Sequence, residues 1–393
     1  MEKERKEKVI LFYRYLPHYR LGLYELLYNS PKFDYSFFVG QKGGEKKEET
    51  LHLPDETPFP VQYRRMWSFQ PLKKKNPMYF QPGEIAAALG RKYNVLILNA
   101  DYHVVSYLLA SILGRLCGKK IIHWGHAVPR KGPEKEGSFR WWFRKLANRL
   151  AHAFLLYGNR EYNLYAERGV DMKRYFPVNN ALDTRPVQAL IDALSPQELE
   201  TFQKEKGLFG RRVLIYTGRL IKEKQVDLGV AAMPRILAKI PNATLLLIGD
   251  GPEMDNLKAQ ARQLQVEDAV IFAGGVYDDA TLTKYYLSSE VAVSPGYIGL
   301  MINHAFMYGL PALTHDNYWI HAPEVIMLQP GETGAFFKEN NAEDLADKAI
   351  ELLGNPEKLA KMRDNCRRLI ATEYNERYMA DRFDKAVEYA LDH

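Results

Sequence analysis

The stretch RVLIYTGRLIKEKQVDLGVAAMPRILAKIPNATLLLIGDGP (residues 212–252) decides the fold class. Its two short apolar runs, 212–218 and 243–249, are typical of buried parallel strands. Between them, residues 224–239 have the apolar spacing of an amphipathic helix. A strand, a helix and a second strand in this order predict a parallel βαβ unit.

The same alternation continues in both directions. Downstream, we expect strands followed by helices at 269–275, 291–296 and 311–315. Upstream, the expected strands are 8–14, 34–40, 61–67, 94–99, 120–125, 153–158 and 174–178. The pattern predicts an α/β protein with two doubly wound, Rossmann-like domains that face a cleft.

The 393 residues exceed what one ordinary core organises, so two domains are expected. Residues 184–210 are polar, carry two prolines and end in glycine, which is typical of an interdomain linker. We therefore expect an N-terminal Rossmann-like domain over 1–183 and a C-terminal Rossmann-like domain over 211–372. The amphipathic end, 373–393, is expected to pack back on the N-terminal domain.

Composition narrows the class of protein. Apolar residues make up 46% and charged residues 26%, as in soluble globular proteins. The net charge is +6, and basic clusters at Pro71–Lys75 and Arg140–Arg149 favour an anionic ligand or an anionic membrane surface. No zinc-finger spacing, RNP-like signature or long basic helix points to nucleic acid.

Cysteine content and hydropathy indicate the compartment. Cys117 and Cys366 are the only cysteines, so a disulfide framework is not expected. The expected compartment is the reducing cytoplasm. No window approaches about 18 uninterrupted apolar residues, and Arg14 interrupts the first apolar run, so neither a membrane span nor a signal peptide is expected. Peripheral contact with the inner face of the plasma membrane stays open.

The turn after the strand 212–218 is the first candidate site, because ligands gather at the carboxyl ends of parallel strands. Arg219 and Lys224 flank this turn directly after Gly218. Cations at a helix start oppose the helix dipole unless an anion binds there. The pair therefore suits a diphosphate, and the alternative is a solvated, charged helix start.

Two further turns repeat this arrangement. Gly249-Asp250-Gly251-Pro252 could serve a ligand or be a plain strand–helix turn. The glycine-rich loop Ser294–Leu300 is expected to point the N–H groups of 299–301 at an anion. His304 lies one turn into the apolar helix that follows, and Glu324 supplies a carboxylate after another strand.

In the first half, two histidines form an HxxH pair. His123 lies within an expected strand and is interpreted as structural, whereas His126 follows the strand end and is expected to face the cleft. No third ligand is near in sequence, so a metal site is not expected. Asp101, and His18 with Arg20, also lie after strands; they could contact a ligand or serve as turn or cap residues.

Several of these motifs recur in a known order. GRLxxxK, LLLIGDGPE, IFAGGV, SPGYIGL…HAFMYGLP, APEVI and PGETGAFF together resemble the C-terminal domain of family 4 retaining glycosyltransferases of the GT-B fold. The resemblance covers residues 212–350. The first half is similar more loosely, through RYLPHYR and HWGHA.

The resemblance implies transfer of a sugar from a nucleotide-diphosphate donor to an acceptor, with retention of the anomeric configuration. It makes 1–183 the acceptor-binding domain, with His18, Arg20 and Asp101 as candidate acceptor contacts, and 211–372 the nucleotide-sugar-binding domain. It implies that Arg219 and Lys224 hold the diphosphate, that backbone from Gly274 to Val276 holds the base, and that His126 meets the transferred sugar. With these, the candidate donor-binding residues are Gly218, Gly249, Gly251, Gly274, Val276, Gly296, Tyr297, Gly299, Leu300, His304 and Glu324.

One feature departs from the family. Its members often carry two glutamates separated by seven residues, in a pattern like EGFGLxxxE, and here Gly296 and His304 stand at those positions. The second glutamate usually binds the donor ribose, so His304 is expected to make that contact. The loss of the first leaves open how the sugar hydroxyls are held and which donor is used.

No Asp-x-Asp motif occurs, so neither a metal nor a resident cofactor is expected; Arg219 and Lys224 would neutralise the leaving diphosphate in a front-face transfer. Ser138–Leu150 combines tryptophan with arginine and lysine, which suits a helix on an anionic membrane or an ordinary helix with buried tryptophan. A glycan or lipid-linked acceptor in bacterial surface polysaccharide synthesis (capsule, O-antigen or exopolysaccharide) would fit both the fold and a membrane-bound helix at 138–150.

Two alternatives on the same fold stay open: a sugar-nucleotide epimerase and a catalytically weak sugar-nucleotide-binding protein. A dinucleotide oxidoreductase is disfavoured because no GxGxxG occurs. A P-loop kinase is disfavoured as well, because GRLCGKK (114–120) is one residue short and lacks Ser or Thr after the lysine.

Overall fold

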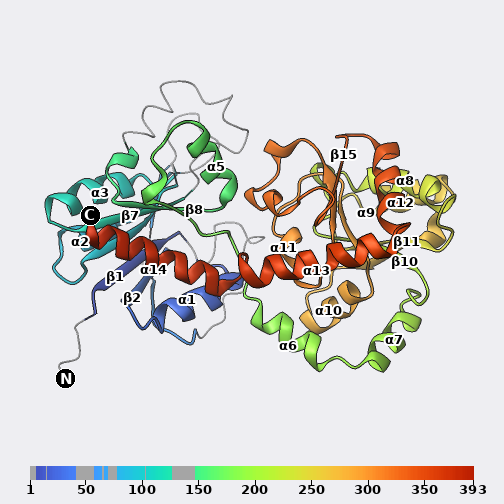
Figure 1. Ribbon diagram of the computed structural model, residues 1–393, viewed down its shortest axis with the longest axis horizontal. Helices are drawn as coiled ribbons and strands as arrows, with labels where there is room; N and C mark the ends of the chain where they lie inside the picture. Colours follow the sequence, from blue (N-terminus) through green and yellow to red (C-terminus); the bar gives the residue numbers. More distant parts are fainter. Residues whose placement is uncertain are drawn as a thin grey trace. The chain divides into compact units, whose positions relative to one another are not determined.

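The computed structural model describes residues 6–14, 16–40, 57–63, 66–69, 78–101, 103–125 and 147–393. The chain forms two compact units (Figure 1). Unit 1 is Met1–Asp183 together with Asn375–His393, and unit 2 is Thr184–Tyr374. His126, the run Pro71–Lys75 and residues 138–146 lie outside the described residues, as do 140–146 of the second basic cluster.

Unit 1 is built on a parallel sheet with the strand order β3-β2-β1-β6-β7-β8-β9. The strands are β1 (Lys8–Tyr13), β2 (Asp34–Val39), β3 (Val61–Tyr63), β6 (Val95–Asn99), β7 (Lys120–Gly125), β8 (Ala153–Leu156) and β9 (Tyr175–Pro177). The short strands β4 (Trp67–Phe69) and β5 (Met78–Phe80) pair antiparallel in a separate sheet.

Helices cover both faces of this sheet. The helices of unit 1 are α1 (Leu21–Tyr28), α2 (Pro82–Leu89), α3 (Ser106–Leu116), α5 (Asn159–Glu167) and α14 (Glu376–Asp392), with a 3-10 turn η1 (His18–Arg20). On one face, α2 and α3 pack over Ile10, Leu96 and Ile121. On the other, α1 and α14 enclose a core that includes Trp124 and Phe383.

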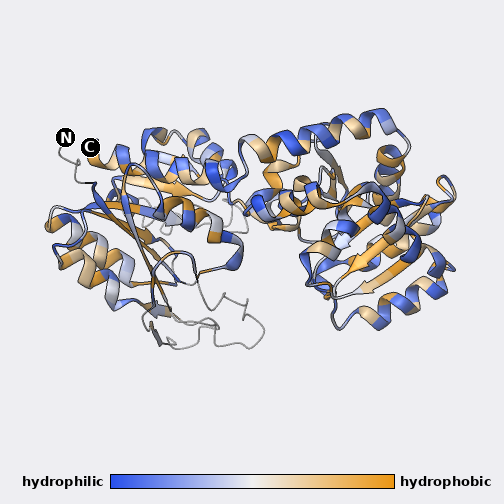
Figure 2. Cartoon of the chain, turned by 90° about the horizontal axis from the view of Figure 1, so that it is seen from below, coloured by the Kyte–Doolittle hydropathy of each residue, from blue (hydrophilic) through white to orange (hydrophobic). Residues whose placement is uncertain are grey.

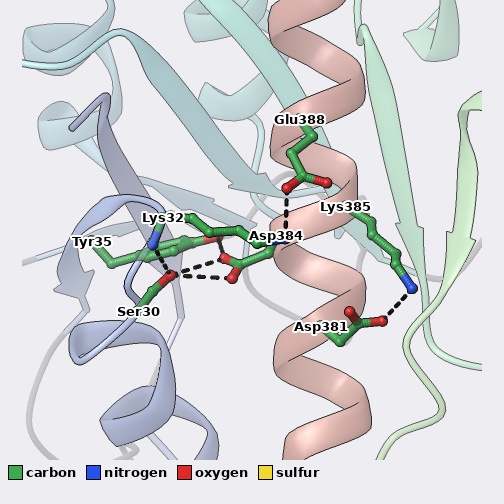
Figure 3. Close-up of polar contacts among 7 residues, drawn as sticks. All are labelled: Ser30, Lys32, Tyr35, Asp381, Asp384, Lys385 and Glu388. Carbon is green, nitrogen blue, oxygen red and sulfur yellow. Dashed lines mark hydrogen bonds and ion pairs between the residues drawn. The ribbon is translucent and has the colours of Figure 1, made fainter. Parts of the chain in front are cut away.

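The last helix, α14, is fastened to unit 1 by polar contacts as well as by its apolar face (Figure 3). The Tyr35 hydroxyl donates to Asp384 at 2.8 Å, and the Ser30 hydroxyl donates to the same carboxylate at 3.1 Å. Lys32 pairs with Glu388 at 2.6 Å. The C-terminal helix is therefore part of unit 1, although 191 intervening residues, Thr184–Tyr374, build unit 2.

Unit 2 is built on a second parallel sheet, with the order β12-β11-β10-β13-β14-β15. Its strands are β10 (Arg212–Thr217), β11 (Ala243–Ile248), β12 (Val270–Gly274), β13 (Val291–Ser294), β14 (Ala312–His315) and β15 (Gly334–Phe337). Figure 2 shows these strands in the colour of hydrophobic residues, as expected for a sheet covered on both faces.

The helices of unit 2 divide between two cores. These helices are α6 (Arg185–Ala193), α7 (Pro196–Glu205), α8 (Val226–Leu237), α9 (Met254–Gln263), α10 (Asp279–Leu287), α11 (Met301–Met307), α12 (Ala342–Leu353) and α13 (Pro356–Thr372). One core joins α8, α9 and α12, and the other joins α7, α10 and α11. Both units thus have the doubly wound order that the sequence predicts, and the expected fold class is confirmed.

Three local expectations need correction. Residues 184–210 are no open linker: they form α6 and α7 of unit 2, because a capping box at Ser195 and Glu198 starts α7 and Phe202 packs edge-to-face on Tyr285. Residues 61–67 are not one strand, since β3 ends at Tyr63 and Trp67 pairs in another sheet. The strands β5 and β15 were not expected.

No helix among the described residues is long and apolar enough to cross a membrane.

Candidate functional site

The strand order of unit 2 reverses between β10 and β13, which are neighbours in the sheet. Chain connections run outward from this point in both directions, so the loops that follow the two strands lie at a topological switch point. Open α/β sheets bind ligands at such a point, outside the carboxyl ends of the strands. The loops concerned are 218–225 and 295–300.

Glycines let the loops after β10, β11 and β12 lie against one another. Gly218 donates its N–H to Ile248 at 2.9 Å, and Gly249 donates to the carbonyl of Gly274 at 2.8 Å. Gly249 has φ +143°, and a Cβ there would overlap the carbonyl oxygen of Gly218. A side chain at position 249 would therefore push these two loops apart.

Gly251 and Asp250 fix the next layer of the same edge. A Cβ at Gly251 would overlap the carbonyl of Leu220, while Leu220 donates its N–H to Asp250 at 2.9 Å. The Asp250 carboxylate accepts the N–H of Gly275 at 3.0 Å. The turn Gly249–Pro252 is thus packed against its neighbours, which gives its glycines a structural role whether or not a ligand binds.

Lys224 joins the loops on either side of the reversal. Its ammonium donates to the carbonyl of Tyr297 at 2.7 Å and lies 4.5 Å from the centre of the Tyr297 ring. Gly296 donates its N–H to the carbonyl of Lys224 at 3.0 Å, and a Cβ there would meet the backbone of Glu223 and Lys224. Burial lowers the pKa of Lys224 to about 8.

Arg219 differs from Lys224 in its surroundings. The Arg219 side chain is exposed and makes no hydrogen bond or ion pair with any residue that the structure describes. Its backbone is held, since the Tyr216 hydroxyl donates to the Arg219 carbonyl at 3.0 Å. The edge therefore has one fixed cation and one guanidinium with its donors available to an anion.

His304 lies on α11, half-buried, at the end of an aromatic stack. Its ring lies parallel to that of Tyr286, with centroids 6.5 Å apart, and Tyr286 stacks on Tyr308 at 4.6 Å. The Tyr286 hydroxyl is 2.6 Å from the hydroxyl of Thr217, the last residue of β10. The stack thus links His304 to the strand end that carries Gly218 and Arg219.

A second histidine orders the glycine-rich loop. Nδ1 of His321 accepts the N–H of Ile298 at 3.2 Å, and Nε2 of His321 donates to the His315 carbonyl at 2.9 Å. Ala322 donates its N–H to the Ile298 carbonyl at 3.0 Å. These bonds hold Gly299 beside the segment that leads into η7 (Pro323–Met327), where Glu324 is buried.

The remaining unit 2 candidates lie at the same edge. Val276, just after β12, packs partly buried against the core around α10, and Leu300 is the residue from which α11 begins. The structure thus gathers the predicted donor-binding residues at the carboxyl edge of one sheet.

The first-half candidates lie in unit 1, in three different environments. His18 is exposed in η1, whereas Arg20, at the end of the same turn, is only 2% exposed. Asp101 accepts the N–H of His103 at 3.0 Å, which is the behaviour of a turn residue. His126 lies outside the described residues, whereas the other three follow the neighbouring parallel strands β1 and β6.

Arg20 is enclosed by aromatic rings. Its guanidinium carbon is 4.8 Å from the Trp124 ring centre, 5.1 Å from that of Tyr13 and 5.4 Å from that of Tyr157. It donates to the side-chain oxygen of Asn180 at 2.7 Å. As placed, Arg20 is a buried cation stabilised by ring faces, and it fastens the chain close to where it leaves unit 1.

The structural interpretation of His123 is confirmed. It lies within β7, fully buried, with Nε2 at 2.8 Å from the Ser111 hydroxyl. Burial lowers the pKa of His123 to about 3, so its ring is neutral at physiological pH.

Three contributors escaped the sequence-based search: His321, Tyr286 and the side chain of Asp250. His321 begins the segment HAPE, in which only Glu324 was singled out. Its position beside the candidate carboxylate was the available signal. Tyr286 lies in an ordinary amphipathic stretch, and nothing in its local sequence indicates a partner 69 residues away.

A known protein family matches the part of the chain that contains this site. A model of the family "Glycosyl transferases group 1" covers residues 199–369. Residues 199–369, called the group 1 region below, are thus similar to this family. The match spans the sheet of unit 2 and every loop of its carboxyl edge described above.

Curated proteins are similar to part of this chain. N-acetyl-alpha-D-glucosaminyl L-malate synthase of Bacillus anthracis is 27% identical over 189 residues, which is 48% of each chain. A GDP-mannose-dependent alpha-(1-6)-phosphatidylinositol monomannoside mannosyltransferase of Mycolicibacterium smegmatis is 23% identical over 43% of this chain and 46% of its own. The chain spans about half the length, or less, of the curated relatives it matches.

Solved structures share the fold over nearly the whole chain. Anabaena Alr3699/HepE in complex with UDP superposes with a TM-score of 0.68 at 15% identity, covering 97% of this chain and 99% of that one. A glycosyltransferase from Rickettsia africae ESF-5 gives 0.70 at 14% identity, over 99% and 100%. Unit 1 and unit 2 thus share the fold of the two-domain, Rossmann-like GT-B architecture.

Proposed function

We propose that this protein is a glycosyltransferase of the family 4 type, which moves a sugar from a nucleotide-diphosphate sugar to an acceptor hydroxyl. The observation that carries the proposal is the placement of Lys224 and Arg219 at the point of strand reversal. Lys224 is fixed against the glycine-rich loop, and Arg219 is exposed beside it. A pair of cations at this point of an α/β sheet suits a diphosphate.

In the reaction, the bond between the anomeric carbon and the donor phosphate oxygen breaks, and the diphosphate leaves with the electron pair. Arg219 and Lys224 neutralise the charge that develops there; preorganised donors of this kind supply roughly 3 kcal/mol each. The acceptor hydroxyl attacks from the side that the diphosphate leaves, and its proton passes to a donor phosphate oxygen. This route retains the anomeric configuration without an enzymic nucleophile or a metal.

Other residues of the edge would bind the nucleoside. We assign the ribose to His304, whose ring is steadied by Tyr286, and a donor hydroxyl to Glu324. The backbone from Gly274 to Val276 would meet the base. Tyr297 and Gly299 belong to the loop that Lys224 and His321 hold in place.

The acceptor is proposed to be a glycan or lipid-linked saccharide in bacterial surface polysaccharide synthesis, made at the cytoplasmic face of the membrane. The names of the relatives support acceptors of differing chemistry, since one is an L-malate synthase and another a phosphatidylinositol monomannoside mannosyltransferase. His126, His18 and Asp101 stay candidates for the acceptor side, while the burial of Arg20 favours a supporting role.

Nucleotide binding tests the donor site directly. Thermal shift and calorimetry with UDP, GDP, dTDP and ADP should give one responding base, because a bound ligand raises apparent stability. Lys224→Ala should abolish the response. Lys222→Ala is the matched control, since Lys222 is an exposed cation of the same turn (η4, Lys222–Lys224) and should leave it unchanged.

Transfer assays then separate the candidate functions. A transferase consumes the responding nucleotide sugar only with an acceptor, retains the anomeric configuration and keeps its rate in a chelator. An epimerase converts the nucleotide sugar alone, and a binding protein shifts in stability without turnover. No shift with any nucleotide in the wild type would refute the assignment of the donor site.

A further inference from the structure

We propose that Arg20 in unit 1 forms one side of a binding site for a small inorganic anion of the size of chloride. The anion supplies the counter-charge of a buried guanidinium at the start of α1. This site is independent of the proposed transferase activity, because it is built from the charge and the hydrogen-bond donors of unit 1 and uses nothing of the group 1 region.

Arg20 is a buried cation that has no carboxylate as a partner. Its side chain is almost completely buried, and its guanidinium is charged at every physiological pH. None of the ion pairs between residues that the structure describes includes Arg20. Burial of a charge is costly unless an opposite charge lies close to it, and aromatic ring faces offset only part of that cost.

The groups that act most strongly on Arg20 are neutral. Burial opposes its charge, and the next strongest influences on its pKa come from the phenols of Tyr13, Tyr157, Tyr19 and Tyr24. Phenols are uncharged at physiological pH. The group that accepts a hydrogen bond from Nη2 of Arg20, the side-chain amide of Asn180, is neutral as well.

The buried carboxylates of unit 1 do not supply the missing charge. Within the described part of this unit they are Glu84, Glu161 and Glu376. Glu84 lies on α2, which packs on the opposite face of the sheet, and Glu161 pairs with Arg160 at 3.2 Å. Glu376 lies in the first turn of α14. No carboxylate, buried or exposed, is among the strongest influences on the pKa of Arg20.

Several hydrogen-bond donors around Arg20 lack an acceptor. Nε and Nη1 of Arg20, Nε1 of Trp124 and the hydroxyl of Tyr24 are buried, and none of them has a hydrogen-bond partner among the described residues. The three nitrogen groups can only donate. The guanidinium carbon lies 4.8 Å from the centre of the Trp124 ring, and Tyr24 follows Arg20 by one turn of α1. Buried donors of this kind require an acceptor close to them.

The start of α1 adds to the positive potential. Arg20 is the N-cap residue of this helix, and its side chain cannot accept the N–H groups of the first turn. A helix N-terminus carries a partial positive charge, so a cation there is unfavourable unless an anion binds. A water molecule could accept the orphan donors but would leave the charge uncompensated. An anion provides both.

The surrounding rings favour a small anion. The ring centres of Trp124, Tyr13, Tyr157 and Tyr19 lie 4.8 to 5.6 Å from the guanidinium carbon, so rings already occupy most directions around Arg20. A monovalent anion balances one guanidinium, whereas a phosphate or a nucleotide brings more atoms and more charge than this environment matches. Chloride is therefore the probe for the site.

Thermal melting of the full chain tests the site. At constant sodium concentration and ionic strength, replacement of gluconate by chloride up to about 300 mM should raise the melting temperature of the wild type by roughly 2–4 °C, along a saturating curve. Nitrate, another small monovalent anion, should act like chloride. Broadening of the chloride magnetic resonance signal by the wild type measures binding directly, and nitrate should reverse it.

Two variants assign the response to this site. Arg20→Gln removes the charge and should abolish both the chloride-dependent stabilisation and the line broadening. Trp124→Phe removes one donor and keeps the guanidinium, so it should weaken chloride binding roughly three- to tenfold, and it keeps the test decisive if Arg20→Gln does not fold. Arg174→Gln is the matched control. Arg174 also lies over a ring, that of Tyr175 at 5.4 Å, but it donates to the Ala151 carbonyl at 3.0 Å, so its loss should leave the chloride response unchanged.

Three results would overturn the proposal. Equal melting of the wild type in chloride and in gluconate would favour an ordered water as the partner of Arg20. An unchanged chloride response in Trp124→Phe and in any folded Arg20→Gln would place the anion elsewhere. Displacement of chloride by the nucleotide panel would make the position a contact of the donor. The nucleotide response measured in gluconate tests the proposed function separately, so the two can fail independently.

Discussion

One imidazole connects two loops of the candidate donor site: Nδ1 of His321 accepts the backbone N–H of Ile298 at 3.2 Å. The other ring nitrogen donates to the His315 carbonyl at 2.9 Å. The two bonds together require a neutral ring with its proton on Nε2. His321 is therefore a positioning residue for the glycine-rich loop between β13 and α11.

Replacement of His321 should weaken nucleotide binding without removing any group that touches the nucleotide. His321→Phe removes both hydrogen bonds but keeps a ring of similar size. We expect the free energy of unfolding to fall by about 1–3 kcal/mol. The Kd of the responding nucleotide should rise roughly 5- to 20-fold. His321→Gln, which can restore one bond, should recover part of the affinity. Full affinity in His321→Phe would contradict the positioning role.

The lowered pKa of Lys224 predicts that nucleotide binding depends on pH. The ordinary pKa of lysine is 10.5 and burial lowers that of Lys224 to about 8, so the ammonium is charged below this value and neutral above it. A bound diphosphate favours the charged form, so affinity should fall as the pH rises from about 8 to 9.5. Calorimetry across this range measures the effect.

Lys224→Arg is the control for this pH dependence, because a guanidinium stays charged throughout the range. Its affinity should be lower than that of the wild type at pH 7, since arginine cannot reproduce the contact with the Tyr297 carbonyl, yet flat with pH. Parallel curves for the two proteins would show that another group titrates.

Glycine at position 249 is predicted to be indispensable for the edge of unit 2. Gly249→Ala should lower the free energy of unfolding by roughly 2–4 kcal/mol, because φ is +143° and the Cβ overlaps the Gly218 carbonyl. Gly299→Ala is the contrast: its Cβ would meet the nearest atom at 3.5 Å, and we expect a change within about 0.5 kcal/mol. Chemical denaturation of both variants decides between them.

Arg20 is expected to contribute more to stability than any exposed ion pair. Arg20→Ala removes a side chain packed among three rings and its bond to Asn180, and it should cost roughly 2–4 kcal/mol. Lys32→Ala breaks an exposed pair with Glu388, for which about 0–1 kcal/mol is expected. Equal destabilisation in denaturant melts would refute the role given to Arg20.

Local patterns were sufficient to predict most of the architecture. The apolar runs at 212–218 and 243–249 became β10 and β11 within one residue at each end, and the helical spacing between them became α8. The glycines that close these runs marked the strand ends. Such features depend on neighbours a few residues apart, which is the range over which hydrophobic periodicity carries information.

Other features needed the tertiary structure. The polar composition of 184–210 predicted a linker, but burial of Phe202 against Tyr285 makes it part of unit 2. The loop position of Arg20 suggested a ligand contact, yet aromatic rings from β1, β7 and the residue after β8 enclose it. Burial depends on partners distant in sequence, which composition does not specify.

By itself, the sequence determined the two α/β halves, the positions of most strands along the chain and the residue types available at the strand ends, because periodicity, glycine and proline act locally. Only the tertiary structure decided which of those residues meet. Lys224 and Tyr297 are 73 residues apart in the sequence. No local pattern can pair two groups at that separation. They come together because parallel strands place all their carboxyl ends at one edge of the sheet, where the strand order reverses.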